Sequence, residues 1–520
     1  MAERKSNGSI DWTSSSSPHN QNDGAATSDH APAVTEAKEQ GPDPLEEPQD
    51  HEYLSGLRLF LVLCGATIAA FLVLLDASIV ATAIPTITSE FHSLNDIGCC
   101  ACQPLSGKIY SYFNVKWTFL AFFAIFEVGS ALCGAAQSSV MLIVGRAVAG
   151  IGASGILNGG YTILALIVQP SRQAGFYVNL PPGALIALFI ITTRFPDYRV
   201  AGDGKQTVLE RIMKLDIPGF LLFAPTVVML ILPLQWGGTR YAWSSATIIG
   251  LFVGSFGNLL VFLGWEYYVG EGALIPLGLL RRRVIWTSCL NMAFLIGCTL
   301  TTAYYFPVWF QAVHGDSPVQ SGVDMLPIIL TNTIVTMITG VLIGRVGYYT
   351  PFALASGIFT SVGSGLVTTL TPHSSNSRRI GYQILQGLQG LGFQVPVLAV
   401  QNGVRRDEVS VASALVVLAQ NLSASVFLSL GQVVFSTELR RYLAEYAPTA
   451  DINAIVAAGA AATNIKAAVP PELLPQVQSA YSATFDNVMY LATGSAAAAF
   501  LVALCMRWVR MKGTTPAVKE

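Results

Sequence analysis

The sequence has little charge. Only 12% of its 520 residues are Asp, Glu, Lys or Arg, whereas soluble domains carry about 25% charged residues. Hydrophobic residues make up 52% of the chain, and this composition predicts a membrane protein. The formal net charge is only −2. Because nucleic-acid-binding proteins need a basic surface, we expect no nucleic-acid partner.

Patterns typical of enzymes and metal sites are also scarce. The sequence contains no nucleophile triad, phosphate-binding loop or histidine cluster with the spacing of zinc ligands. Most of the eight cysteines lie in apolar runs, and the crowded Cys99, Cys100 and Cys102 lack histidine neighbours. We therefore expect no enzyme, no metal and no cofactor. The first fifty residues are polar, so we expect the first apolar run to direct its own insertion.

Long apolar runs dominate what is present. A helix needs about 20 apolar residues to cross a bilayer. Runs of suitable length lie near 57–80, 117–137, 140–168, 176–194, 217–235, 245–265, 285–306, 321–344, 349–371, 381–401, 410–436 and 486–507. Another run, near 97–113, is interrupted by Gln103, Pro104 and Lys108. The pattern predicts an all-α polytopic membrane protein.

The distribution of basic residues predicts the orientation of the later spans. Arginines recur at every second connection, as at Arg281–Arg283, Arg345 and Arg405–Arg406. Such connections face the cytosol under the positive-inside rule. We expect a multi-pass monomer in the plasma membrane, with the vacuolar membrane as the alternative.

The two halves of the chain contain similar segments, and we expect the chain to have six parts. Arg146-Ala-Val-Ala-Gly150-Ile-Gly152 resembles Gln386-Gly-Leu-Gln-Gly390-Leu-Gly392 about 240 residues later. This repeat suggests two related bundles, a plan common among secondary transporters. The parts are a disordered cytosolic tail (1–55), an N-terminal bundle (56–200), two linking spans (201–270), a C-terminal bundle (271–436), an external loop (437–485) and a last span with a short cytosolic tail (486–520).

A single carboxylate, Asp76, follows the uncharged stretch from Leu59 to Leu75. An ionised side chain in hydrocarbon costs roughly 3 kcal/mol or more, so acids there usually have a function. At 1.5 Å per residue, Asp76 lies about 26 Å along the helix toward the outer side. We predict that it binds and releases protons. The alternative is an acid at the helix end that rests among the lipid headgroups.

The segment Leu75-Asp76-Ala-Ser-Ile-Val80-Ala-Thr-Ala-Ile-Pro85 resembles a known first-span signature. It is the signature of the major facilitator superfamily, in its fourteen-span drug:proton antiporter branch. The match runs from about Arg58 to Arg510 and is most similar to efflux pumps that filamentous fungi keep beside secondary-metabolite genes. Further matching segments are Gly107-Lys108 through Lys116 (the loop between spans two and three), Leu142–Ala153 (the fourth span), Phe176–Gly183 (the start of the sixth) and Tyr304–Val313 (the end of the ninth).

The resemblance implies a two-bundle fold with two extra linking spans. It also implies proton-coupled export of small amphipathic molecules such as a fungal toxin, a secondary metabolite or a drug. The expected partners are therefore a small-molecule substrate, protons and the lipid bilayer. Two alternatives remain: a siderophore or nutrient carrier of the same superfamily, and a non-transporting protein such as a sensor or a truncated isoform.

Two further charges are candidates for proton coupling. Arg146 is the only charge between Val140 and Val168, and the resemblance assigns it a role in proton transfer. Glu127 lies in the middle of the preceding span and could pair with Arg146. A purely structural ion pair would explain both residues equally well.

Polar and aromatic side chains in the C-terminal half could line a pocket for amphipathic substrates. Interhelical hydrogen bonds and aromatic belts are the alternative explanation for the same residues. The candidates are Gln383, Gln386, Gln389, Gln394, Tyr304, Tyr305 and Phe306. In the other half, small residues at Gly150, Gly152 and Gly155 predict close helix packing.

The chain departs from the family at two places. Between Val168 and the span that begins near Phe176, the family has a whole fifth span, which is missing here. Span two is also shortened, by about a dozen residues between Asp96 and Gln103. The few residues between Val168 and Phe176 reach at most ~3.5 Å each, so they cannot recross the ~30 Å of hydrocarbon. An inverted first half, irregular helix packing or a segment lost through mis-assigned splicing would explain the missing fifth span, and we favour the last.

Overall fold

The computed structural model describes residues 90–167, 210, 212, 214–238, 241–452, 455–456 and 469–511. All of them belong to one compact unit, Glu52–Glu520. The predicted tail, the span near 57–80 with Asp76, and the span near 176–194 lie outside the described residues.

The described residues form helices, and within these ranges the β-structure consists of two isolated bridges, Gly237 with Tyr241 and Tyr348 with Arg510. The helices before residue 270 are α2 (Glu90–Tyr112), α3 (Val115–Gly134), α4 (Ser139–Ile167), α8 (Ile217–Trp236) and α9 (Ala246–Val269). Those that follow are η2 (Gly270–Gly272), α10 (Leu277–Leu280), α11 (Arg283–Trp309), η3 (Phe310–His314), α12 (Pro318–Asp324), α13 (Leu326–Val346), α14 (Thr350–Val367), α15 (Asn376–Gly387), η4 (Leu388–Leu391), α16 (Val395–Gly403), η5 (Arg406–Glu408), α17 (Val409–Tyr446) and α20 (Leu474–Leu504).

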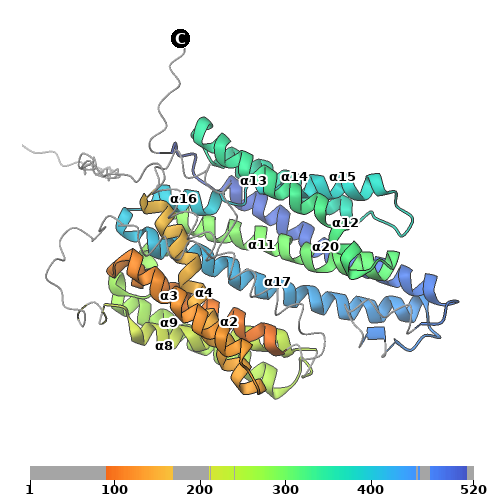
Figure 1. Cartoon of the computed structure of the whole chain (residues 1–520), viewed down its shortest axis with the longest axis horizontal. Coiled ribbons are helices and arrows are strands. Elements are labelled where there is room, and N and C mark those ends of the chain that lie inside the picture. The colour runs from red at the N-terminus through yellow and green to blue at the C-terminus, as the bar shows by residue number, and fades with distance from the viewer. Residues whose placement is uncertain are drawn as a thin grey trace, which may run out of the picture. The chain divides into compact units, whose positions relative to one another are not determined.

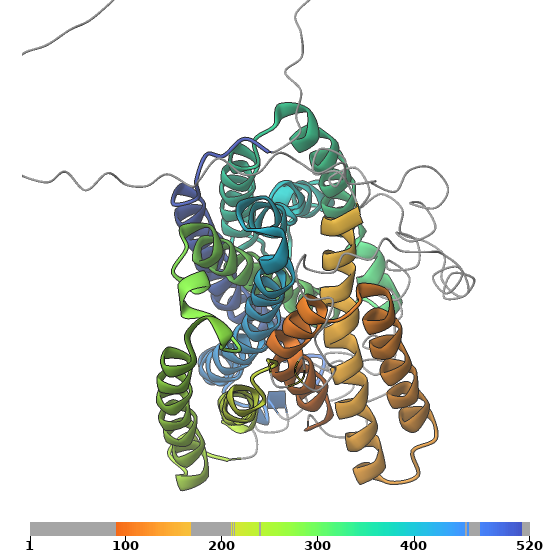
Figure 2. The same cartoon turned by 90° about the vertical axis from the view of Figure 1, so that its left-hand side faces the viewer.

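The helices form two groups with α17 between them. Helix α4 packs on α2 and α3, and α8 packs on α9 and α2. In the other group, α20 packs on α11 and α14, and α15 packs on α13 and α14. Helix α17 contacts members of both groups, namely α2, α4, α11 and α20. Figure 1 shows the two groups on opposite sides of α17, and Figure 2 shows the same helices turned by 90°.

The exposed surface confirms the prediction of a polytopic membrane protein. Eight helices in the described part of the chain are long and apolar enough to cross a membrane. Large apolar side chains are exposed along them, including Leu221, Phe256, Ile329 and Ile338. A soluble protein rarely leaves so much apolar surface uncovered, so these faces contact lipid.

The second span and the connection after it differ from expectation. Helix α2 is continuous over 23 residues although it contains Pro104. Gly107 and Lys108, expected in a loop, lie within this helix, and only Phe113 and Asn114 separate it from α3. The next helix begins directly afterwards, because the Asn114 side chain caps it by accepting hydrogen bonds from the backbone N–H groups of Lys116 and Trp117.

The span expected as one helix near 381–401 is broken instead. Helix α15 ends at Gly387, a 3₁₀ turn follows over Leu388–Leu391, and α16 begins at Val395. Hydroxyl groups of neighbouring helices donate hydrogen bonds to backbone carbonyls at the break. Ser356 Oγ donates to the Gln389 carbonyl at 2.9 Å, and Thr336 Oγ1 donates to the Gly390 carbonyl at 3.3 Å. These hydrogen bonds replace the backbone hydrogen bonds that the helix loses at the break, which allows a broken helix inside a bilayer.

The expected external loop is shorter than residues 437–485. Helix α17 continues to Tyr446 and α20 already begins at Leu474. At ~1.5 Å per residue, the 38 residues of α17 span about 57 Å, which exceeds the hydrocarbon thickness of ~30 Å. Both helices therefore extend beyond the membrane.

We predict that Gly152→Ala destabilises the contact between α3 and α4. A Cβ atom at Gly152 would lie 2.4 Å from the backbone nitrogen of Phe126, so the helices must separate. Overpacking of this kind costs about 1–3 kcal/mol. Gly160→Ala on the same helix is the matched control, because a Cβ atom there has no neighbour within 4 Å. The melting temperature of the detergent-solubilised protein should fall only for Gly152→Ala, and equal values would contradict the close approach.

Candidate functional site

Buried polar side chains gather where α11, α14 and the broken α15–η4 segment meet. We call this group the polar seam, which consists of Cys298, Thr299, Thr302, Ser364, Gln386 and Gln389. Gln386 is only 1% exposed and Gln389 only 3%. The break after Gly387 lets both amides point toward the same neighbouring helix, α11.

The two amides of the polar seam donate hydrogen bonds to different turns of α11. Gln386 Nε2 donates to Thr302 Oγ1 at 2.7 Å, and to Ser364 Oγ of α14 at 3.0 Å. Gln389 Nε2 donates to the Leu295 carbonyl at 2.7 Å and to Thr299 Oγ1 at 2.5 Å. The alternative explanation for the glutamines was hydrogen bonding between helices. It accounts for the Nε2 groups of Gln386 and Gln389.

The acceptor ends of the glutamines are different. Among the described residues, the Oε1 atoms of Gln383, Gln386 and Gln394 are buried and receive no hydrogen bond. A buried acceptor without a donor loses about 1–3 kcal/mol of hydration. A small molecule with a hydroxyl or amine group could supply the missing donors, so Gln386 of the polar seam and the neighbouring Gln383 and Gln394 are chemically able to bind a partly polar ligand.

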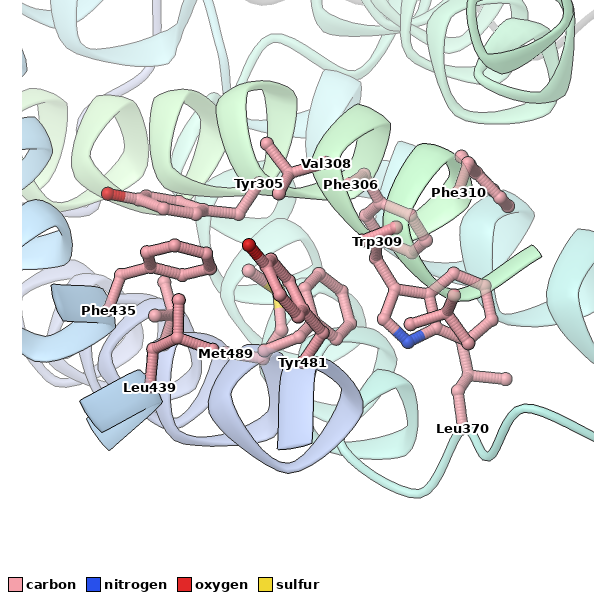
Figure 3. Close-up of a cluster of buried hydrophobic side chains, with 14 of the residues drawn as sticks. Tyr305, Phe306, Val308, Trp309, Phe310, Leu370, Phe435, Leu439, Tyr481 and Met489 are labelled. Atoms are coloured by element: carbon pink, nitrogen blue, oxygen red, sulfur yellow. The ribbon is translucent and has the colours of Figure 1, made fainter. Parts of the chain in front are cut away.

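An aromatic cluster adjoins the polar seam. Tyr305, Phe306 and Trp309 of α11 face Phe435 of α17 and Tyr481 of α20 (Figure 3). The ring centroids of Tyr305 and Phe435 are 5.4 Å apart, and Trp309 Nε1 donates to Ser482 Oγ at 3.3 Å. Phe306 lies one helical turn after Thr302, the partner of Gln386, so the seam and the cluster are contiguous.

The structure separates one of the predicted pocket residues from the others. Tyr305 and Phe306 are buried in the aromatic cluster, whereas Tyr304 is 48% exposed on the outer face of α11. Gln383, Gln386 and Gln389 are buried together, and Gln394 is half-buried beyond the break. The contiguous candidates are therefore the three buried glutamines with Tyr305 and Phe306.

In the N-terminal helices, Glu127 and Arg146 lie apart. Arg146 is 2% exposed and engaged in contacts on α4, whereas Glu127 lies on the exposed side of α3. Gly145 approaches Cys133 and Gly129 approaches Ala149, so Arg146 is level with the end of α3 and not with Glu127. The pairing considered from the sequence is not what the structure shows.

The predicted small-residue face lies against α3. A Cβ atom at Gly152 or Gly155 would collide with the backbone of Phe126 or the ring of Phe122. Gly150 is buried on the same helix. Helices α3 and α4 thus approach each other closely at these glycines, as a packing role requires.

Sequence reasoning missed three acids. Asp216 and Glu266 are buried near Lys108, and Asp486 is half-buried on α20 with an Oδ1 atom that has no partner among the described residues. Each lies at or just beyond the edge of a predicted apolar run, where an acid looks like an ordinary helix end. A buried acid at such an edge can be recognised only when its neighbours from other helices are known.

Comparison with known proteins identifies the family. The model of the Major Facilitator Superfamily matches residues 66–179. The MFS-type transporter pigP of Monascus ruber is 42% identical over 506 aligned positions, which cover 89% of this chain and 88% of that protein. The efflux pump mlcE of Penicillium citrinum is 41% identical over 521 positions, covering 90% and 94%. A bacterial homologue of the human lysosomal transporter Spinster aligns with a TM-score of 0.48 at 15% identity, covering 88% and 100%.

The same alignments contain internal gaps in this chain. Since 89% of 520 residues is about 463, roughly 43 of the 506 positions shared with pigP pair its residues with gaps here. For mlcE, 90% of the chain is about 468 residues, so about 53 of 521 positions are gaps. The family resemblance seen in the motifs is confirmed over most of the chain, which belongs to the major facilitator superfamily, a family of membrane transporters and not of enzymes.

Proposed function

We propose that the protein is a proton-driven exporter of small amphipathic molecules, such as a fungal secondary metabolite or toxin. The observation that carries this proposal is the similarity over about nine-tenths of the chain to proteins named as efflux pumps and transporters, at about 40% identity. As a multi-pass protein of this kind, it would act as a monomer in the plasma membrane.

The polar seam and the aromatic cluster support an amphipathic substrate. Binding sites for small molecules are mostly apolar, with a few placed polar groups. The unpaired acceptors of Gln383 and Gln386 would bind hydroxyl or amine groups, while Tyr305 and Phe306 would contact apolar rings or chains. A strongly charged substrate would find no opposite charge within this group of residues.

Proton coupling would depend on charges in the N-terminal half. We assign proton binding to Asp76, which lies outside the described residues, and proton transfer to the buried Arg146. Glu127 remains a second candidate for proton binding, independent of Arg146. Rocking of the two bundles about a central site would expose the substrate to one side of the membrane at a time.

Deletion of the gene in its source organism tests the export function. A compound should accumulate inside the deletion strain and decrease in the medium, and re-expression should reverse both changes. Vesicles that contain the purified protein should then transport the accumulated compound. Unchanged metabolite profiles in cells that normally express the gene would contradict export.

We predict that Asp76→Asn abolishes export while leaving the protein in the membrane. Asparagine keeps the size of the side chain but cannot exchange a proton. The measurement is the intracellular level of the exported compound together with membrane abundance. Glu472→Gln, at an exposed acid before α20, is the control and should export normally. Wild-type export by Asp76→Asn would remove this residue from the mechanism.

We predict that Gln386→Leu raises the KM for export several-fold. The substitution removes an acceptor proposed to bind substrate, and it frees Thr302 and Ser364, which now accept from the amide. Gln320→Leu, at an exposed glutamine whose side chain donates to half-buried Asp324, is the control. An unchanged KM in a folded Gln386→Leu variant would show that the seam has only a structural role.

We predict that transcripts from the source organism encode about 40 more residues than this chain. The number of gapped positions is of the size expected if a fifth span after Val168 and about a dozen residues of span two before Gln103 are lost. Sequencing of the complete messenger RNA measures this directly. Transcripts that lack both segments would show instead that the shortened first half is the native product.

A further inference from the structure

The chain after α20 folds back against the connection between α13 and α14 (Figure 1). Helix α20 ends at Leu504, and Tyr348 forms an isolated antiparallel bridge with Arg510. Thr350 Oγ1 donates to the Arg507 carbonyl at 3.0 Å. These contacts hold the segment after α20 at one end of the helices, which is the end that the arginine pattern predicts to be cytosolic.

Four exposed arginines lie around these contacts. Arg345 is in the last turn of α13, and Arg507 and Arg510 are in the segment after α20. Arg283 begins α11, and its Nε donates to the Cys505 carbonyl at 2.7 Å, which brings a fourth guanidinium group to the same segment. We call Arg283, Arg345, Arg507 and Arg510 the basic rim.

The basic rim differs from other arginines at this end of the helices, because those already have acidic partners. Arg282 forms a bidentate pair with Glu408, at 2.7 and 2.9 Å, and Arg405 contacts the same carboxylate at 3.1 Å. Within the described part of the chain, no acid forms an ion pair with an arginine of the basic rim. The rim therefore keeps a positive charge that an anion from outside the chain can neutralise.

Apolar side chains lie directly beside these charges. Trp508, between two arginines of the basic rim, is 62% exposed, and Tyr348 is exposed as well. Exposed Trp and Tyr side chains at the end of a membrane span are typical of the depth at which lipid headgroups lie. Leu501 and Leu504, in the last turn of α20, are also exposed and face the lipid. The charges thus lie at headgroup level, and the lipid-facing surface begins one helical turn away.

We propose that the basic rim binds the headgroup of an anionic phospholipid, such as phosphatidylserine, in the leaflet at this end of the helices. Guanidinium groups donate paired hydrogen bonds to phosphate oxygens, and basic sites at the cytosolic ends of membrane helices bind anionic headgroups. The acyl chains would lie along Leu501 and Leu504, with Trp508 beside the glycerol group. A free phosphate ion would make no use of these apolar side chains, so the combination favours a lipid. This proposal goes beyond export and does not depend on it.

Native mass spectrometry of the full chain in detergent measures the binding of added phosphatidylserine. Phosphatidylcholine with the same acyl chains should bind more weakly, because it has no net charge. Arg510→Gln should lower the affinity for phosphatidylserine about fivefold, and adding Arg507→Gln should lower it about fivefold again. Arg405→Gln is the matched control, since it removes an exposed charge at the same end that is already paired, and it should leave the affinity unchanged.

An unchanged affinity in Arg507→Gln/Arg510→Gln would overturn the proposal. Equal losses in Arg510→Gln and Arg405→Gln would do so too, because the lipid would then respond to the general charge of this face. Displacement of the lipid by an equal concentration of inorganic phosphate would assign the basic rim to free anions instead.

Photo-labelling of the unchanged protein tests the same site without a substitution. A phosphatidylserine with a photoreactive group on its acyl chain, in vesicles that contain the full chain, should label the peptide that includes Leu501–Met511. Labelling confined to other helices would contradict the proposed position even if the arginine variants fail to fold. Neither experiment needs a transported substrate or a pH gradient, so both results are independent of whether the protein exports.

Discussion

Hydrocarbon cannot form hydrogen bonds, and the arrangement of these helices follows from that constraint. Every polar group between the spans must find its partner inside the protein. Between α8 and α9, Asn258 donates to the Leu222 carbonyl and to Thr226, and Ser255 donates to the Thr226 carbonyl. Between α11 and α20, Asn291 donates to the Ala499 carbonyl and Ser495 to the Phe294 carbonyl. These contacts fix which apolar faces meet.

The same constraint distinguishes apolar contacts between helices from polar ones. Apolar packing between membrane helices differs little from packing against lipid, so it allows many arrangements. A buried charge or amide allows few, because losing its partner exposes it to hydrocarbon. The polar seam is therefore a place where binding or release of a ligand would change the relative stability of transport states.

Sequence patterns predict the uniformly apolar helices well. The runs expected near 217–235, 245–265 and 285–306 correspond to α8, α9 and α11 within a few residues at each end. Their limits follow from local composition, because lipid-facing residues are apolar whatever the neighbouring helix is. The family and the transporter class also follow from motifs whose order and spacing are specific.

The remaining features depend on partners that are distant in the sequence. The break after Gly387 is stabilised by hydroxyl groups of Ser356 and Thr336, which no local pattern reveals. The family resemblance predicts Lys108 in a loop, yet it is buried in α2, where its ammonium donates to the backbone carbonyls of Lys214 and Gly272. Sequence reasoning finds a costly residue but cannot name the residue that compensates it.

Transport by sealed vesicles tests most directly whether hydrogen ions drive export. The vesicles contain the purified protein with all its spans and a pH-sensitive dye, and mass spectrometry follows the exported compound. If hydrogen ions drive export, the compound moves against its gradient only while a pH gradient is present, and each imposed gradient of the compound moves protons the opposite way. Equal accumulation after an ionophore has collapsed the pH gradient would contradict proton-driven export.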